Sequence, residues 1–215
     1  MRSTQETLIR DVAVVCLAVG LVGVSFGAIA VGEGLPVWLP MLMSVVVFAG
    51  ASQFMFVGIV AAGGNPFAAA LAGLLVNARH LPFGFAVGDL LQTWRERLLG
   101  SHFVIDESVA FVLAQEDWRL RRRAFWLCGI GLFGMWNLGV LVGTVGGTAV
   151  TDTDALGLDA AFPAVTLALV LPALADRATR TAALLGAVIA VAATPFLTAG
   201  VPILLALVAV WVAVR

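Results

Sequence analysis

The most informative stretch of this sequence reads Val76-Asn77-Ala78-Arg79-His80-Leu81-Pro82-Phe83-Gly84. It lies in an apolar run from Asn65 to Val87 whose only ionisable residues are Arg79 and His80. At a helical rise of about 1.5 Å per residue, Arg79 would lie roughly 21 Å into a hydrocarbon layer about 30 Å thick. A cation at that depth costs on the order of 2.5–3.5 kcal/mol on insertion scales. We therefore expect Arg79 to face a bundle interior or a wet cavity, where its partner is either a structural acid or a substrate. The alternative is that Arg79 lies nearer a membrane interface than this count gives.

The same stretch predicts a broken helix. Pro82 removes a backbone donor and disfavours helical geometry at Leu81. Irregular backbone at membrane depth is tolerated where it is buried in protein or lines a cavity, and transporters use such breaks to hold substrate near the midplane. Asn77, Arg79 and His80 thus coincide with a break in the third expected span.

Composition places the chain among helical membrane proteins. It has 215 residues, of which 61% are hydrophobic and 12% charged, and its mean hydropathy is +1.06. A soluble domain carries about twice that charge. Apolar runs of about 20 residues recur along the chain, which predicts an all-α polytopic membrane protein with a single domain over 1–215. Cys16 and Cys128 lie in apolar runs and suggest neither a disulfide nor a metal site.

The first two expected spans carry further candidates. The first, about 11–32, has Gly23 and Gly27 at the spacing of a close-packing face, with Ser25 between them. The second, about 38–62, places Gln53 near the bilayer centre. Gln53 is either inter-helix glue or part of a binding site, and the adjoining aromatic and polar side chains could line it; these are Phe48, Ser52 and Phe54.

The segment 101–115 is the hardest to assign. Its 15 residues would rise only about 22 Å, which is short of a crossing, and its middle contains Asp106 and Glu107. The two acids lie either in an interfacial turn or on a wet pathway. The basic residues that follow it are typical of a topology signal beside anionic lipid rather than of a nucleic-acid site; these are Arg119, Arg121, Arg122 and Arg123.

Further spans are expected over about 124–150, 156–175, 181–197 and 200–214. The total is about seven, or eight if 101–115 crosses. Both schemes put nine arginines in the cytoplasm and two outside, so they predict a cytoplasmic C-terminus and leave the N-terminus open. Length favours seven. Gly20–Gly27 resembles Gly131–Gly139, which suggests repeat halves 1–115 and 116–215, inverted in the seven-span scheme and parallel in the eight-span scheme.

The chain resembles the AzlC family, the large subunit of branched-chain amino acid exporters. The resemblance rests on short blocks that occur in the family's order. They are Phe26-Gly27, Ser44 with Phe48-Ala49-Gly50-Ala51-Ser52-Gln53-Phe54, Asn77-Ala78-Arg79-His80-Leu81, Asp106-Glu107-Ser108, and Gly157-Leu158-Asp159 with Pro163. Ala78 and Ile105 depart from the family pattern, which usually has a large apolar residue at the first position and often Thr at the second.

The resemblance implies export of branched-chain and similar apolar amino acids across the cell membrane, driven by an ion gradient, with a small AzlD-like membrane subunit. No phosphate-binding loop is present, so the chain brings no ATPase of its own, and no cofactor is expected. On this hypothesis a substrate site comprises Arg79, Asn77, Gln53, Ser52, Ser25, Phe48 and Phe54, while His80, Asp106 and Glu107 couple ion movement.

Three other functions remain open from the residues alone. An uptake carrier of the same fold would have the same sequence features. A non-transporting scaffold or sensor would also be apolar throughout. An intramembrane hydrolase could use Ser52 or Ser108 with His80 or His102, but Gly50-Ala51-Ser52-Gln53-Phe54 lacks the second glycine of a nucleophile elbow, and no His-Glu-x-x-His metal motif occurs.

Overall fold

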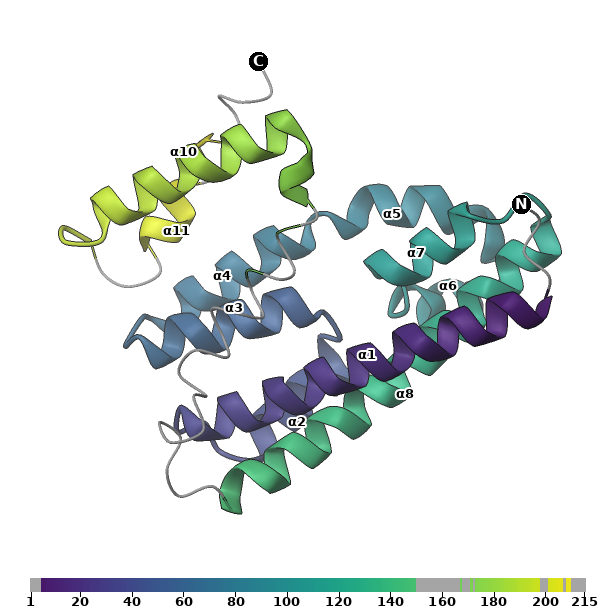
Figure 1. The fold of residues 1–215 in the computed structure, drawn as a ribbon, viewed down its shortest axis with the longest axis horizontal. Coiled ribbons are helices and arrows are strands. Elements are labelled where there is room, and N and C mark those ends of the chain that lie inside the picture. The colour runs from purple at the N-terminus through teal and green to yellow at the C-terminus, as the bar shows by residue number, and fades with distance from the viewer. Residues whose placement is uncertain are drawn as a thin grey trace. The chain divides into compact units, whose positions relative to one another are not determined.

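The computed structural model describes residues 5–149, 167, 171, 173–197, 201–206 and 208–209. In this described part the secondary structure is helical and contains no strand (Figure 1). The chain divides into two compact units. The first, called here the α1–α8 unit, comprises Met1–Gly50 and Asn77–Thr151; the second comprises Ala51–Val76 and Asp152–Arg215. These units interleave along the chain, and the repeat halves 1–115 and 116–215 stay a prediction.

Two long helices form the centre of the α1–α8 unit: α1, Gln5–Gly32, and α8, Trp118–Ala149. They pack through glycines that allow the backbones to touch. A Cβ added at Gly139 would overlap the Gly20 carbonyl, and one at Gly143 would overlap the Val24 carbonyl. The close-packing role expected for Gly23 is also present, because a Cβ there would lie 2.8 Å from the Trp136 carbonyl oxygen.

These contacts give the relative direction of the two helices. The Cys16 sulfur lies beside Gly131, Gly20 beside Gly139, and Ala28 beside Gly147. Residue numbers therefore rise together, so α1 and α8 are parallel, as Figure 1 shows from their colour order. This is the relation that the eight-span scheme requires between the first span and 124–150. The glycine segments that suggested a repeat are the two sides of one interface.

The second expected span is interrupted. Helix α2 covers Trp38–Val46 and α3 covers Gly50–Ala61, with Phe48 at φ +42° between them. A positive φ is costly for a residue with a Cβ, yet the Phe48 ring is buried and packs edge-on against Phe133 at 5.1 Å between centroids. The expected span 38–62 is therefore divided between two helices, and the sequence analysis did not predict this interruption.

The third expected span is broken as predicted, but slightly earlier. Helix α4, Pro66–Asn77, ends before Ala78, and α5, His80–Val87, begins after Arg79. Pro82 is the third residue of α5, in the first turn, where a missing N–H breaks no intrahelical bond. The break thus falls at Ala78 and Arg79 rather than at Leu81.

Three short elements connect α5 to α8: η1, a 3₁₀ turn at Gly88–Leu90; α6, Trp94–Ser101; and α7, Asp106–Leu113. Thr93 caps α6 by accepting from the Glu96 amide, while the Glu96 carboxylate accepts from the Thr93 amide. These elements share an apolar core with the start of α8, made of Val87, Leu90, Leu91, Val104, Val109, Val112 and Phe125.

The second unit contains most of α3 and α4 and the C-terminal helices. Ile59 of α3 packs with Ala69 and Ala72 of α4. Helix α10, Arg177–Ala193, begins after the cap residue Asp176 and meets α11, Val201–Ala206, where Gly186 approaches Ala206; η2 covers Ala173–Ala175. Most of the expected span 156–175, with the Gly157-Leu158-Asp159 block and Pro163, lies outside the described residues.

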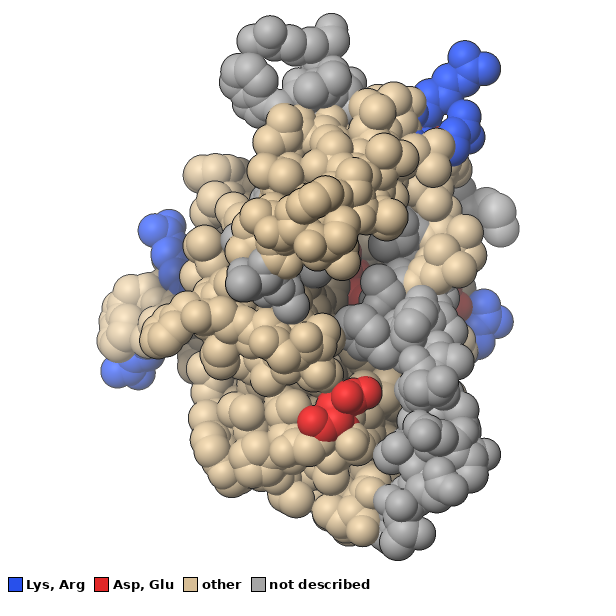
Figure 2. All heavy atoms as spheres, turned by 90° about the vertical axis from the view of Figure 1, so that its left-hand side faces the viewer, with Lys and Arg blue, Asp and Glu red and all other residues tan. Residues whose placement is uncertain are grey.

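Large apolar side chains lie on the surface, as expected for helices in lipid. Phe85 is 88% exposed and Leu21 71% exposed, and Figure 2 shows a face on which few side chains of Lys, Arg, Asp or Glu are visible. Among the described residues, three helical stretches are long and apolar enough to cross a membrane: Glu6–Gly32, Pro66–Leu90 and Trp118–Thr148. The described part of the chain thus has the all-helical structure of a membrane protein; the total of seven or eight spans stays a prediction.

Candidate functional site: an ion pair at a helix break

Arg79 lies in the break between α4 and α5 and pairs with an acid from a distant element. Its Nη2 is 2.8 Å from Oδ2 of Asp106, the first residue of α7. The two side chains are 39% and 44% exposed. The pair consists of one contact, so Arg79 keeps further guanidinium N–H donors that have no ion-pair partner among the described residues. Arg79 can therefore exchange this partner for another anion.

Two further titratable side chains adjoin the pair. His80 is the first residue of α5, and its ring lies 6.1 Å from that of Phe83. Glu107 follows Asp106 in the first turn of α7. The structure thus joins Arg79 to Asp106, and their chain neighbours His80 and Glu107 are the other two predicted residues at this place. Asn77, the last residue of α4, has a buried Oδ1 without a partner among the described residues.

Ser108 holds the turn that presents Asp106. Its buried hydroxyl accepts from the Ile105 amide at 3.1 Å and lies 2.6 Å from the Phe103 carbonyl oxygen. These bonds satisfy the backbone of the loop between α6 and α7. A fully buried hydroxyl with this structural role does not support Ser108 as a nucleophile.

Phe48 lies in a different cluster of the same unit. Its ring is 5.7 Å from that of His102, and both rings pack against Phe133 of α8. The hydroxyl of Ser25 donates to the Leu21 carbonyl at 3.3 Å, so this hydrogen bond lies within α1. Neither residue touches Arg79 through a described contact.

The other expected substrate residues belong to the second unit. Gln53 is fully buried, and both of its amide atoms lack partners among the described residues. Buried amides are normally hydrogen-bonded, so Gln53 is the residue of α3 best suited to form hydrogen bonds with a further polar group. Ser52 faces Gly73 of α4, and Phe54 is buried.

Sequence reasoning missed several polar contacts that shape the site's surroundings. Ser44 donates to Oδ1 of Asn137 at 2.7 Å and joins α2 to α8. Arg121 pairs with Asp89 at 3.0 Å. Asn137 lies in the middle of an apolar span, which indicates that it needs a polar partner such as Ser44. The sequence does not indicate which acid pairs with Arg121, because Arg121 lies among charged residues beside the membrane.

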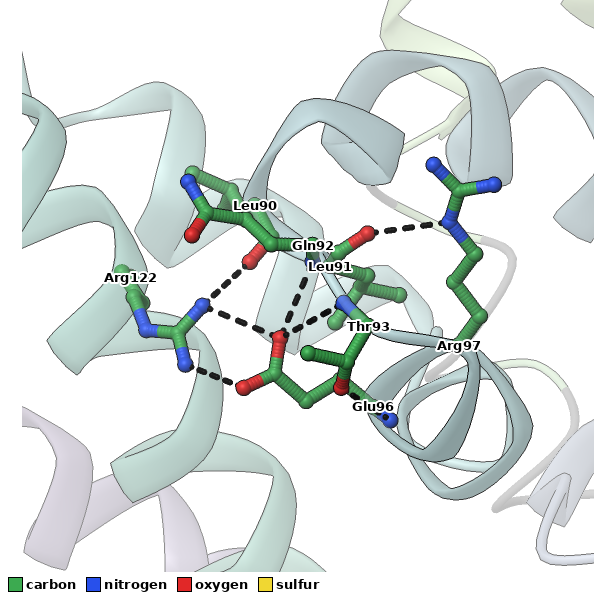
Figure 3. Close-up of polar contacts among 7 residues, drawn as sticks. All are labelled: Leu90, Leu91, Gln92, Thr93, Glu96, Arg97 and Arg122. Carbon is green, nitrogen blue, oxygen red and sulfur yellow. Dashed lines mark hydrogen bonds and ion pairs between the residues drawn. The ribbon is translucent and has the colours of Figure 1, made fainter.

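The strongest of these contacts joins α6 to α8 (Figure 3). The Arg122 guanidinium donates to both carboxylate oxygens of Glu96, at 2.6 and 3.3 Å, and to the Leu90 carbonyl at 2.7 Å. The Gln92 amide donates to the same carboxylate at 2.9 Å. Hydrogen bonds from Arg122 and from the backbone lower the pKa of Glu96 to about 2. This bidentate contact is fixed, in contrast to the single contact between Arg79 and Asp106.

No group of three or more His, Cys, Asp or Glu side chains that could hold a metal ion occurs in the described part of the chain.

Comparison with known proteins identifies relatives among membrane proteins. The family model described as AzlC protein matches residues 14–150. An uncharacterized membrane protein of Helicobacter pylori (strain ATCC 700392 / 26695) is 26% identical over 175 residues, which cover 80% of this chain and 76% of that protein. The branched-chain amino acid transport protein AzlC of Bacillus subtilis (strain 168) is 28% identical over 137 residues, 58% of this chain and 54% of that protein. No solved structure matches the chain.

Proposed function

Because the chain belongs to the AzlC family, we propose that it exports branched-chain and similar apolar amino acids across the cell membrane. The family and the similarity to a branched-chain amino acid transport protein support a membrane transport role. The substrate class and the outward direction are the parts that we add to this role.

The observation that carries the proposal is the ion pair between Arg79 and Asp106 at the break of a membrane helix. An amino acid zwitterion needs a cation for its carboxylate, an acid or carbonyls for its ammonium, and an apolar wall for its side chain. The pair offers both charges 2.8 Å apart. When a substrate inserts, its carboxylate takes the place of Asp106 on Arg79, and Asp106 becomes free to accept the substrate ammonium.

Ion coupling in this proposal uses the same four residues. Protonation of Asp106 removes the anion that accepts the substrate ammonium, so a proton and the substrate compete for the site, as exchange of the two requires. His80 lies at the start of α5, next to Arg79 in the chain, and can pass or hold that proton because imidazole titrates near neutral pH. Glu107 is a second acceptor in the first turn of α7. In this cycle a proton moves inward and is released to the cytoplasm, and the amino acid moves outward in exchange.

We propose that a small AzlD-like membrane subunit completes the transporter. Apolar side chains such as Leu17 and Leu21 are more than half exposed on α1; lipid or a helical subunit can cover them. The C-terminus is proposed to be cytoplasmic, as the arginine distribution predicts.

The test is amino acid counterflow in vesicles that contain the chain and the small subunit. Vesicles preloaded with unlabelled leucine should transiently accumulate labelled leucine, and lysine preloading should not support it. A scaffold, a sensor or a hydrolase gives no counterflow, so its absence with both proteins correctly inserted would overturn the proposal. Export is distinguished from uptake by net flux: leucine-loaded cells that lack the chain should retain leucine longer.

A further inference from the structure

The two ends of the α6–α7 segment lie at the same end of α8. At its beginning, Glu96 of α6 contacts Arg122, in the second turn of α8. At its end, α7 stops at Leu113, and Asp117 caps α8 by accepting from the amides of Arg119 and Leu120. The chain from Thr93 to Asp117 therefore leaves the start of α8 and returns to it.

The middle of the segment lies deep along α8. Phe103 packs beside Gly129, whose added Cβ would lie 2.7 Å from the Phe103 Cβ, and its ring is 5.8 Å from that of Phe133. Counted from Arg123, the last arginine of α8, these positions lie about 9 and 15 Å along the helix. That is roughly the midplane of a hydrocarbon layer about 30 Å thick. Helices α6 and α7, with eight residues each, are each about 12 Å long and reach this depth without crossing.

Helix α5 brings Arg79 to the same depth. Its C-terminal end lies at the start of α8, where Arg121 pairs with Asp89 and its guanidinium lies 3.4 Å from the Ala86 carbonyl oxygen. Its N-terminal end carries Arg79 to Asp106, at the tip of the α6–α7 segment. Helix α5 thus runs from mid-depth back to the end of α8 at which α6 begins.

We propose that α6 and α7 form a re-entrant hairpin that enters and leaves the membrane on one side, and that this side also holds the N-terminus. The shared side of the N-terminus and the hairpin follows from the parallel packing of α1 on α8, because both helices then begin on the same side. Since α1 ends on the opposite side and residues 91–117 contribute no crossing, an odd number of crossings lies between Glu33 and Asp89. Pro66–Leu90 is long enough for one.

The arginine distribution supports this topology independently. Every arginine before residue 149 other than Arg79 falls on the proposed side: Arg2, Arg10, Arg95, Arg97, Arg119, Arg121, Arg122 and Arg123. Each scheme derived from the sequence alone left two of these on the opposite side. The positive-inside rule then makes this side cytoplasmic, so the hairpin carries Asp106 to the midplane from the cytoplasm.

The test is labelling of cysteines introduced one at a time, with a membrane-impermeant maleimide, in intact cells and in inverted vesicles. Cys16 and Cys128 are buried, so the parent protein gives the background. The variants Arg10→Cys, Arg95→Cys and Glu116→Cys should react in inverted vesicles only, and Glu33→Cys in intact cells only. Labelling of Arg95→Cys and Glu116→Cys from opposite sides would overturn the hairpin, and labelling of Arg10→Cys and Glu116→Cys from opposite sides would overturn the shared side. Detergent-solubilised protein confirms that each thiol is reactive.

A cross-link tests the depth of the hairpin tip. The pair Phe103→Cys with Gly129→Cys should form a disulfide on oxidation, whereas Phe103→Cys with Gly146→Cys should not. Absence of the first cross-link in protein that labels normally would contradict the hairpin. Neither measurement requires transport. Labelling or cross-linking that contradicts the topology therefore does not contradict the proposed function, and absence of counterflow does not contradict the topology.

Discussion

Arg79 and Arg122 carry the same charge but are held in different ways. Arg79 has one ion-pair contact among the described residues, to a partly exposed aspartate. Arg122 donates to two carboxylate oxygens and one carbonyl. The number of contacts separates an arginine that can change partners from one that holds two helices together.

Arg79→Gln should reduce substrate affinity strongly. Losing a charged hydrogen bond costs about 1.5–3 kcal/mol, which corresponds to about 10- to 150-fold weaker binding. The measurement is the leucine concentration that half-saturates counterflow, with the exposed Arg95→Gln as the matched control. The exchange Arg79→Asp with Asp106→Arg keeps the ion pair but moves the cation to α7. If the exchanged protein transports normally, Arg79 is a structural partner rather than the carboxylate anchor.

Glu96→Gln should lower the melting temperature at neutral pH. The folded-state pKa of about 2 lies below the unfolded value of about 4.3. A depressed pKa stabilises the fold above the unfolded value, and that stabilisation disappears as the pH falls from about 4.3 to 2. The difference in melting temperature between parent and variant should therefore shrink over this range. Equal stability of the two proteins at pH 7 would contradict the role of this contact.

The residues of the site were partly predictable. A cation in an apolar run is costly, so Arg79 was identifiable from its position alone, and Asp106 was a candidate acid for the same reason. Their pairing was not predictable, because it depends on how α5 and the α6–α7 segment fold against α8. Phe48 was expected to line a binding site, which stays a prediction; the structure shows its ring packed against His102 and Phe133 beside a helix break.

At the scale of elements, the glycines of α8 divide into two kinds. Gly143 meets the Val24 backbone, whereas an added Cβ at Gly146 has open space. In a helix, Gly→Ala is otherwise favourable by up to about 1 kcal/mol. Gly143→Ala should therefore destabilise the protein by about 1–3 kcal/mol through overpacking, while Gly146→Ala should be neutral or slightly stabilising. Thermal unfolding in detergent measures both, and equal effects would show that the contact between α1 and α8 is loose.

Helix breaks were predictable where the chain chemistry requires them. Pro82 indicated the interruption of the third span, and its place in the first turn of α5 explains why the break precedes it. The interruption at Phe48 carries no such signal, since an aromatic residue at φ +42° is retained by its packing rather than by its own preference. Segment 101–115 was too short for a crossing, and the short helix α7 within it agrees with that expectation.

At the scale of the whole molecule, coupling requires that proton movement and substrate movement depend on each other. His80→Gln should flatten the pH dependence of leucine flux between about pH 5 and 8, because imidazole is the group that titrates there. Flux at a fixed substrate concentration, measured across this range, checks the prediction. His102→Gln is the control, since its ring packs against Phe48 and Phe133 instead. An unchanged profile in His80→Gln removes this residue from coupling.

Membrane topology was the least predictable property. Glycines spaced four apart pack equally well in parallel and antiparallel helices, so the sequence predicted a close contact without its direction. Counting arginines also failed to choose, because both schemes assumed that every long apolar stretch crosses completely. The parallel contact of α1 with α8 is the observation that changes how many arginines are assigned to each side of the membrane.

That contact also constrains how the protein is made. Gly20 of α1 leaves the ribosome roughly 120 residues before Gly139, its neighbour on α8, which at about 5–20 residues per second is a delay of ~6–24 s. During synthesis the nascent first helix must wait in the bilayer with its glycine face covered by lipid or by the insertion machinery. The pairing of these two helices is thus a late event of biogenesis, and variants with a bulky residue on that face should be inserted normally and then be degraded for failing to assemble.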